Sequence, residues 1–509
     1  MQNVSIQVSQ LSYNYAHGTA PAVHDVTLSF DHGQVILIAG ESGSGKTTLF
    51  RCINGLIPQS YKNGTLSGSV HVGGESTASM RLAQLARRIG TVLQDPEKQM
   101  VSAQVRNDIA FGLENMGIPR EEIVARVTDV ARRLNIETLL ERATHSLSGG
   151  ERQKVAIAGV LVMRPQVLLF DEPLASLDPR SARAALGLFR SLADDGMTVV
   201  MVEHRVQAAL QAKPDQCVEL AQGKVIFQGD ASAFIDWRST QRESAWPDNL
   251  DSTPASIRAA DATVKMAAKP LLELRNVQFA YPDKPATLKQ VSLSIYPGDV
   301  VALMGSNGAG KSTLSKMAIG ILRPASGQVM LNQQSAHTMS VAHMARQVGY
   351  VFQHPSSMLF ANTLREELSF GPRNIGLDEA SIDQAIARAM QQVNLTDLSL
   401  ERSPFALSYG QQKRVAIASV LAMQPQLLFL DEPTAGLDDA TARKLMDSLI
   451  VEQRQQQRLQ AMVLITHDMA LARAYANRVL VLADGAIVAE GTPDVVLNDR
   501  ALLEHCNLL

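Results

Sequence analysis

Short apolar runs alternate along this chain with longer segments in which apolar residues recur at helical spacing. Residues 35–39 and 300–304 are unbroken apolar runs that each lead into a glycine-rich turn, which is typical of buried strands. Between residues 120 and 140 the apolar positions fall at near-helical intervals, at Ile123, Val127, Val130, Ala131 and Leu134. The pattern predicts an α/β fold with mainly parallel sheets flanked by helices, and an antiparallel element near the start of each half.

The second half of the sequence repeats the first at an offset of about 260 residues, which indicates a duplicated domain and not a short-period solenoid. The two copies are predicted at residues 1–237 and 271–509. Each should carry a helical subdomain between its Gln and Ser motifs. The matching positions are Tyr15 and Tyr281, Gln94 and Gln353, Ser148 and Ser408, Asp171 and Asp431, and His204 and His467.

Residues 238–270 are predicted to link the two copies, because they are polar or alanine-rich and lack a strong apolar period. A flexible linker of this length would reach roughly 30 Å, enough for the two domains to pair within one chain. Trp246 is expected to anchor the linker on a domain surface.

Composition narrows the class of protein. The 509 residues are 46% hydrophobic, enough for large cores, and the net charge of −3 argues against a nucleic-acid binder with a broad basic surface. Three cysteines without close spacing indicate neither a disulfide framework nor a zinc site, so a reducing cytoplasm fits best. No apolar stretch is long enough to span a membrane and the N-terminus does not look like a signal peptide, so a soluble or peripheral protein is expected.

Both glycine-rich turns match the phosphate-loop pattern G-x-x-x-x-G-K-[ST]. One such match could be an ordinary glycine turn entering a helix, but two in the same strand context predict two nucleoside triphosphate sites. Backbone N–H groups and the lysine would bind phosphates, and the hydroxyl of Thr47 or Ser312 would ligate Mg²⁺. The predicted loop residues are Gly40, Glu41, Ser42, Gly43, Ser44, Gly45, Lys46, Thr47 and Thr48 in the first copy, and Gly305, Ser306, Asn307, Gly308, Ala309, Gly310, Lys311, Ser312 and Thr313 in the second.

Downstream of each phosphate loop an apolar run ends in two carboxylates, Asp171-Glu172 and Asp431-Glu432. An Asp-Glu pair alone is a weak signal, but after a strand beyond a phosphate loop it indicates the Walker B arrangement. There the aspartate helps to hold Mg²⁺ and the glutamate is a candidate general base for the attacking water.

The pentapeptides at residues 147–151 (LSGGE) and 407–411 (LSYGQ) precede these runs and are each expected to open a helix. Alone they could be serine-capped helix starts. In this order and spacing they match the signature motif, and the sequence resembles the ATP-binding cassette (ABC) family over almost the whole of both halves.

The resemblance implies roles for the remaining matched residues. Tyr15 and Tyr281 would stack on adenine, Gln94 and Gln353 would contact Mg²⁺ and the attacking water, and His204 and His467 would contact the γ-phosphate. Asp178 and Asp438 would be D-loop residues that reach the opposite domain. The Mg²⁺ set would be Thr47, Gln94 and Asp171 in one site and Ser312, Gln353 and Asp431 in the other.

In this family the two domains pack head to tail, so the signature of one completes the site of the other. One composite site would join the first-copy residues to Ser408 and Gly410, and the other would join the second-copy residues to Ser148 and Gly150. Tyr409 departs from the family pattern by replacing the first signature glycine. Ser408 and Gly410 remain, so both sites are expected to hydrolyse ATP.

The segments that follow Gln94 and Gln353, and the second signature segment, resemble the ATPases of energy-coupling factor importers. That resemblance implies an integral membrane coupling protein, a small substrate-binding membrane protein, and a place on the cytoplasmic face of the cell membrane. The cargo would be a vitamin, a vitamin precursor or a transition-metal ion. Acidic contacts to the coupling protein are expected near the Q-loops, from Asp95, Glu97, Glu366 and Glu367.

Two alternatives stay open. A tandem-cassette sugar importer ATPase has the same length, although its second phosphate loop usually departs from the consensus. A cassette translation factor also has two domains, although its long charged connector is absent here.

Overall fold

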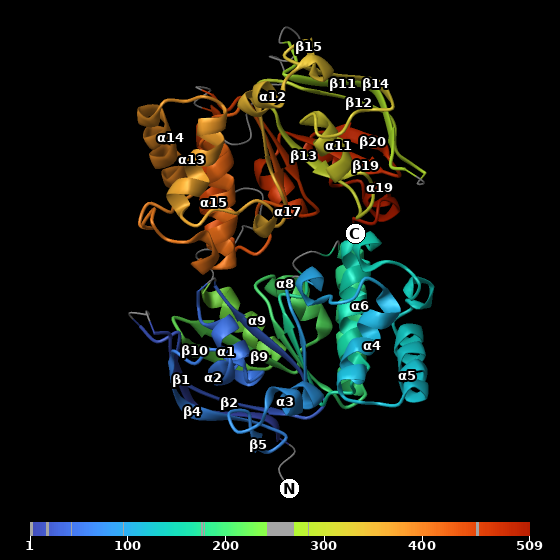
Figure 1. Ribbon diagram of the computed structural model, residues 1–509, viewed down its shortest axis with the longest axis vertical. Coiled ribbons are helices and arrows are strands. Elements are labelled where there is room, and N and C mark those ends of the chain that lie inside the picture. The colour runs from blue at the N-terminus through green and yellow to red at the C-terminus, as the bar shows by residue number, and fades with distance from the viewer. Residues whose placement is uncertain are drawn as a thin grey trace. The chain divides into compact units, whose positions relative to one another are not determined.

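The computed structural model describes residues 4–16, 20–41, 43–94, 96–174, 177, 179–241, 269–282, 285–454 and 458–508. The chain divides into two compact units, Met1–Glu243 and Ser244–Leu509 (Figure 1). Trp246 and residues 242–268 of the predicted linker lie outside the described part of the chain. The first residues of that predicted linker, 238–241, are helical and end helix α9.

In the described part of the first domain, six strands form the core sheet in the order β10-β9-β3-β8-β7-β6. Only the β9–β10 pair is antiparallel, as the sequence pattern predicted for a mainly parallel sheet. The strands are β3 (Val35–Gly40), β6 (Ile89–Val92), β7 (Val167–Asp171), β8 (Thr198–Val202), β9 (Gln216–Ala221) and β10 (Lys224–Gly229).

A second, antiparallel sheet of the first domain has the order β2-β1-β4-β5 over the described residues, which confirms the predicted antiparallel element. Its strands are β1 (Val4–Asn14), β2 (Val23–Asp31), β4 (Thr65–Val72) and β5 (Glu75–Ser76). Helix α1 follows the phosphate loop and contacts both sheets. The helices outside the helical subdomain are α1 (Lys46–Ile53), α2 (Leu56–Gln59), α3 (Leu82–Arg88), α7 (Pro179–Asp194), α8 (Val206–Ala209) and α9 (Ala231–Gln241).

Helices α4 (Val105–Asn115), α5 (Arg120–Arg133) and α6 (Gly149–Leu161) pack on one another as the predicted helical subdomain (Figure 1). Helix α5 buries four of the five apolar residues predicted at helical spacing, from Ile123 to Ala131, and the fifth, Leu134, is buried at its C-terminal cap. It stops at Arg133 and not at residue 140, because Asn135 adopts a φ of 53° that a right-handed helix cannot continue.

The second domain repeats this architecture over its described residues, with sheets in the orders β12-β11-β14-β15 and β16-β17-β18-β13-β19-β20. Its strands are β11 (Leu272–Ala280), β12 (Ala286–Ile295), β13 (Val300–Met304), β14 (Ser326–Leu331), β15 (Gln334–Ser335), β16 (Val348–Val351), β17 (Leu427–Asp431), β18 (Ala461–Ile465), β19 (Arg478–Ala483) and β20 (Ala486–Gly491). Its helices are α11 (Lys311–Ala318), α12 (Val341–Gln347), α13 (Leu364–Asn374), α14 (Glu379–Gln392), α15 (Tyr409–Leu421), α16 (Asp439–Arg454), α17 (Met469–Tyr475), α18 (Pro493–Val496) and α19 (Arg500–His505).

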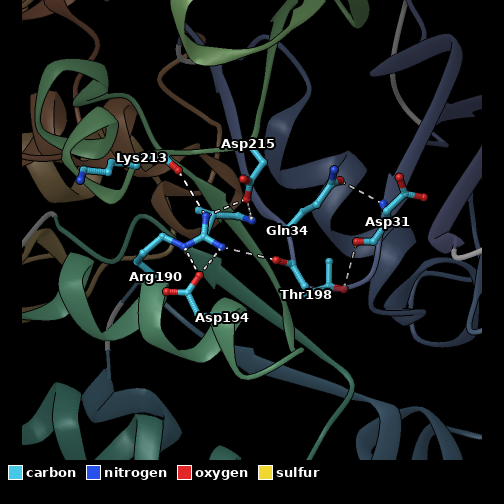
Figure 2. A network of polar contacts seen from close by, with 9 residues as sticks. Asp31, Gln34, Arg190, Asp194, Thr198, Lys213 and Asp215 are labelled. Carbon is cyan, nitrogen blue, oxygen red and sulfur yellow. Dashed lines mark hydrogen bonds and ion pairs between the residues drawn. The ribbon is translucent and has the colours of Figure 1, made fainter.

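A polar network fixes the starts of the core strands in the first domain (Figure 2). Arg190 on α7 donates to Asp215 at 2.8 Å, and the same carboxylate accepts the main-chain N–H of Val35, the first residue of β3, at 2.7 Å. Thr198 donates to Ser5 Oγ at 2.8 Å and joins β8 to the antiparallel sheet. These bonds hold β3 in place, and β3 leads directly into the phosphate loop.

The second domain anchors β13 in the same way. Asn477 Oδ1 accepts the N–H of Val300 at 3.0 Å. The buried Arg478 donates to Asp299 at 2.9 Å and to the carbonyl of Ser294 at 2.8 Å.

No helix in the described residues is long and apolar enough to cross a membrane.

Candidate active sites

Each phosphate loop joins the end of a central strand to the start of a helix, over residues 40–46 in the first domain and 305–311 in the second. Gly40 has a φ of 145°. A Cβ at this position would lie 2.3 Å from the carbonyl oxygen of Leu220 on β9, and the equivalent contact at Gly305 is 2.2 Å. Only glycine allows the loop to pass this close to the neighbouring strand.

The lysine of each loop folds back over the turn. Lys46 Nζ donates to the first two carbonyls of its loop at 2.6 and 2.7 Å, and Lys311 does the same at 2.6 and 2.9 Å. Ser44 Oγ is buried without a hydrogen-bond partner among the described residues. Thr47 and Ser312 lie exposed in the first helical turn. The lysine and the helix N-terminus of each loop, joined in the first loop by the unpaired Ser44 hydroxyl, fit a polyphosphate.

The other predicted loop residues lie in the same turns, and the predicted tyrosines lie beside them. Tyr15 Oη is 3.2 Å from Thr48 Oγ1, and Tyr281 Oη is 3.3 Å from Thr313 Oγ1. Ser42 lies outside the described residues. The described members are Gly40, Glu41, Gly43 and Gly45 in the first domain, and Gly305, Ser306, Asn307, Gly308, Ala309 and Gly310 in the second.

The paired carboxylates stand where β7 and β17 end. Glu172 and Glu432 both adopt a φ of 47°, a left-handed conformation that is uncommon outside glycine. The main-chain N–H of each glutamate donates at 2.9 Å to the last carbonyl of the adjacent strand, at Val202 or Ile465. Such left-handed turns store backbone strain and are often found at functional sites.

The two Walker B aspartates lie in sites that disfavour an isolated negative charge. Burial, and then the neighbouring Glu172, raises the pKa of Asp171 to about 7. Burial, and then Glu432, raises the pKa of Asp431 to about 6, while Tyr350 Oη donates to Asp431 Oδ2 at 3.0 Å. A bound cation reverses this tendency by stabilising the carboxylate form, so the two sites fit a metal-binding role.

In the first domain, Gln94 and His204 meet at Glu172. Gln94 Nε2 donates to Glu172 Oε2 at 2.7 Å, and His204 Nδ1 lies 3.5 Å from the same oxygen. Burial alone would raise the pKa of Glu172, but His204, Lys46 and Gln94 together lower it. Burial would likewise lower the pKa of His204, but Glu172 outweighs it and raises that pKa. Glu172 is therefore an ionised acceptor placed between two predicted motif residues.

In the second domain, Glu432 is held by the loop that carries His467. His467 Nδ1 lies 2.7 Å from Glu432 Oε1, which also accepts the main-chain N–H of His467 at 3.2 Å. Thr466 Oγ1 donates to Glu432 Oε2 at 3.3 Å. The structure thus brings the predicted glutamate and histidine into direct contact.

Both signature segments begin helices, as predicted. Ser148 caps α6 and Ser408 caps α15, and each forms a reciprocal capping box with the residue three positions later. Tyr409 is the first residue of α15, and it is not among the described residues with positive φ. The missing glycine therefore imposes no backbone strain at this position. Gly150 and Gly410 follow in the first turns of the two helices.

A buried lysine distinguishes the second signature helix. Lys413 Nζ donates to the carbonyls of Gln353 at 2.6 Å and Asp431 at 3.2 Å, and its side chain is fully buried. The first domain has Gln153 at this position, and its Nε2 donates to the carbonyl of Pro173 at 2.6 Å. In the second domain, α15 is thus tied to both the Q-loop and β17.

The remaining predicted residues fall into different surroundings. Asp438 caps α16 by accepting the N–H of Thr441 at 2.9 Å, and Asp178 and Asp95 lie outside the described residues. Glu367 does not lie on the surface as a partner contact would. Its side chain is buried, and its Oε2 accepts the main-chain N–H groups of Phe360 and Ala361, both at 2.9 Å. Glu97 and Glu366 are exposed.

Sequence reasoning missed three buried polar residues beside these sites: Glu203, Tyr350 and Lys413. Their positions in the other copy hold Thr466, Thr91 and Gln153. A difference in polarity between two otherwise matching copies was the available signal, but the sequence alone did not show which differences are buried.

The family model described as ABC transporter matches residues 23–175 and 288–435. A protein of Vibrio vulnificus (strain YJ016) that is named as an ABC transporter ATP-binding protein is 33% identical to this chain. The alignment covers 99% of this chain and 93% of the relative. A similarly named protein of Methanosarcina acetivorans is 34% identical over 99% of this chain and 88% of its own length.

A solved structure of CbiO1 from Clostridium perfringens, part of the ABC transporter complex CbiONQ, is 32% identical over 47% of this chain and 95% of that chain, with a TM-score of 0.42. The family matches in both halves, together with relatives that align over the full length, agree with the two sets of phosphate loop, Walker B and signature residues. The chain therefore belongs to the ABC transporter family, as an ATP-binding subunit with two fused ATPase domains.

Proposed function

We propose that this chain energises an ABC importer of the energy-coupling factor type, which takes up a vitamin, a vitamin precursor or a transition-metal ion. The observation that carries the subtype is the pair of segments following Gln94 and Gln353, at residues 94–117 and 353–377, which resemble that group in both copies. The partners would be an integral membrane coupling protein and a small substrate-binding membrane protein, at the cytoplasmic face of the cell membrane.

The two domains are proposed to pair head to tail within one chain, so that each ATP lies between a phosphate loop and the opposite signature. The capped helix starts at Ser148 and Ser408 support this role, because a helix N-terminus stabilises the negative charge of a γ-phosphate. Loss of the γ-phosphate would remove these contacts and let the domains separate. The D-loop aspartates Asp178 and Asp438 are proposed to contact the opposite domain, and Tyr15 and Tyr281 to stack on adenine.

Mg²⁺ is the proposed cofactor of both sites, where it would neutralise phosphate charge during γ-phosphoryl transfer. The donor sets provide a hydroxyl, an amide and a carboxylate oxygen, which suit a hard cation that also binds phosphate oxygens. They are Thr47, Gln94 and Asp171 in the first domain, and Ser312, Gln353 and Asp431 in the second. Glu172 and Glu432 would accept a proton from the attacking water, and His204 and His467 would contact the γ-phosphate.

Exposed apolar side chains next to both Q-loops support docking of a membrane partner there. Phe360 and Phe370 are 57% and 52% exposed, and their rings lie edge to face with centroids 4.8 Å apart. The matching positions in the first domain, Val101 and Phe111, are 61% and 46% exposed. Apolar groups repeated at one place in two domains favour a helix of the coupling protein as the occupant of each.

Purification of the tagged full chain from detergent-solubilised membranes tests the proposal. We expect small integral membrane proteins to be recovered with it, and a substrate-binding assay on the recovered subunit would identify the cargo. Recovery with ribosomes instead would favour the translation-factor alternative, and recovery with the membrane subunits of a sugar importer would favour the other.

A further inference from the structure

The two copies differ in the loop that carries the histidine, at residues 203–205 and 466–468. Each loop follows a central strand, β8 or β18, and precedes a short helix. The residue before the histidine is Glu203 in the first domain and Thr466 in the second, and both side chains are fully buried. The first domain therefore has a buried carboxylate where the second has a buried hydroxyl, next to the glutamate proposed as general base.

Glu203 accepts three main-chain N–H groups. Leu174 donates to Oε1 at 2.8 Å, and His204 and Arg205 donate to Oε2 at 3.1 and 3.2 Å. Arg205 Nη1 in turn donates to the carbonyl of Leu174 at 2.8 Å. These bonds tie the histidine loop to the segment that follows the Walker B carboxylates, without using Glu172.

The same histidine N–H has a different acceptor in the second domain. The N–H of His467 donates to the catalytic candidate Glu432 at 3.2 Å, and Thr466 donates to that carboxylate as well. In the first domain Glu203 accepts this N–H, and Glu172 accepts Gln94 Nε2 at 2.7 Å. Glu172 thus accepts its hydrogen bond from the Q-loop, while His204 Nδ1 lies 3.5 Å away. Glu432 instead accepts hydrogen bonds from its histidine loop.

We propose that Glu203 is a positioning residue that takes over the histidine-loop amide and thereby frees Glu172 to be oriented by Gln94. Hydrolysis that depends on Glu172 should then follow the position of the first Q-loop closely. Hydrolysis that depends on Glu432 should depend less on the position of the second Q-loop, because the histidine loop already orients the Glu432 side chain. The inference rests on the proposed roles of Glu172 and Glu432.

A double-mutant cycle in the full chain tests the assignment. With Glu432→Gln as background, so that Glu172 supplies the measured ATPase, Gln94→Ala is introduced with Glu203 present and with Glu203→Thr. We expect Gln94→Ala to lower kcat about 3- to 10-fold more with Glu203 present than in the Glu203→Thr chain. Glu203→Thr alone should change the KM for ATP less than 2-fold, because Glu203 is not among the proposed ATP and Mg²⁺ ligands. Equal factors in both contexts would overturn the proposal.

The conservative variant Glu203→Gln keeps an oxygen that can accept the His204 and Arg205 N–H groups, so it should keep most of the dependence on Gln94. Glu367→Thr is the matched control. It also removes a buried carboxylate that accepts two main-chain N–H groups, but in the second helical subdomain, and it should leave the effect of Gln94→Ala unchanged.

A reciprocal cycle does not require the Glu203→Thr chain to fold. In a Glu172→Gln background, Thr466→Glu should make Gln353→Ala more costly to kcat than it is with threonine present. An unchanged cost would contradict the role given to this position. If Glu172 and Glu432 are not catalytic, the result would be different. The Glu432→Gln and Glu172→Gln chains would then keep near-normal ATPase activity that does not depend on residue 203 or 466.

Discussion

At the scale of single residues, the two copies show how the glutamate proposed as general base is oriented by different neighbours. Glu172 and Glu432 share the same left-handed φ and the same main-chain bond to the adjacent strand. Their carboxylates nevertheless accept hydrogen bonds from different loops, Glu172 from Gln94 and Glu432 from the main-chain N–H of His467. The backbone conformation thus fixes the main-chain position of each glutamate, and the surrounding polar residues fix the position of its carboxylate oxygens.

Glu172→Gln and Glu432→Gln should each strongly reduce turnover, and the double variant should lose about 100-fold or more. Glutamine keeps the shape of the side chain but cannot accept a proton from water, and such general-base steps are commonly worth 10²- to 10⁴-fold. Phosphate release at saturating ATP measures the effect. Glu114→Gln, an exposed carboxylate on α4, is the control and should be unchanged. Near-normal activity in either single variant would count against two hydrolytic sites.

The phosphate-loop and signature segments could be located from sequence because each is a local pattern, a turn that leads directly into a helix start. Glu203, Tyr350 and Lys413 could not, because each acts on a residue brought near by the sheet. Tyr350 on β16 reaches Asp431 on β17, for example, only because these strands are neighbours. Strand order is not visible in the spacing of a single strand.

At the scale of elements, apolar runs located the central strands, and helical spacing located α5. Element ends were less predictable where one residue decides them, as Asn135 does. The prediction that Glu367 is a surface contact for the coupling protein was wrong for a related reason. Its carboxylate accepts N–H groups from the turn preceding α13, and that turn forms only in the folded domain.

Lys413 should stiffen the second domain by joining α15 to the Q-loop and to β17. Lys413→Met keeps a long apolar stem but leaves the Gln353 and Asp431 carbonyls without this donor. We expect amide hydrogen exchange near residues 352–354 to become about 10-fold faster or more, because local opening becomes easier. Lys444→Met, on the exposed face of α16, is the control. Unchanged exchange in the Lys413 variant would show that the contact does not restrain the Q-loop.

Arg478 should be a major stabilising contact of the second domain. Its guanidinium joins β19 to Asp299, to the Ser294 carbonyl and to Glu490 on β20. Arg478→Ala would leave the fully buried Asp299 without its ion pair, which typically costs about 3 to 5 kcal/mol in the free energy of unfolding. Urea unfolding of the second domain measures the change. Arg500→Ala removes an exposed ion pair with Glu504 and should cost less than about 1 kcal/mol.

At the scale of the whole molecule, duplication provides two ATPase domains whose motifs agree and whose surroundings have diverged. Each domain has its own sheets, helical subdomain and apolar core, and both keep the same fold although the polar residues around their sites differ. Surface positions that stay apolar in both copies despite this divergence are the best candidates for a shared requirement, such as binding one kind of partner.

The Phe360–Phe370 pair is predicted to be needed for partner binding but not for ATP hydrolysis by the isolated chain. Phe360→Ala with Phe370→Ala removes two exposed rings from the surface beside the second Q-loop, and interface aromatic residues often contribute 2 kcal/mol or more to binding. We expect at least about 10-fold less membrane partner to be recovered with the double variant, and ATPase activity of the isolated chain within 2-fold of the unchanged protein. Val341→Ala, which shortens an 87% exposed side chain on α12, should affect neither measurement. Full recovery of the partner with the double variant would place the docking surface elsewhere on the chain.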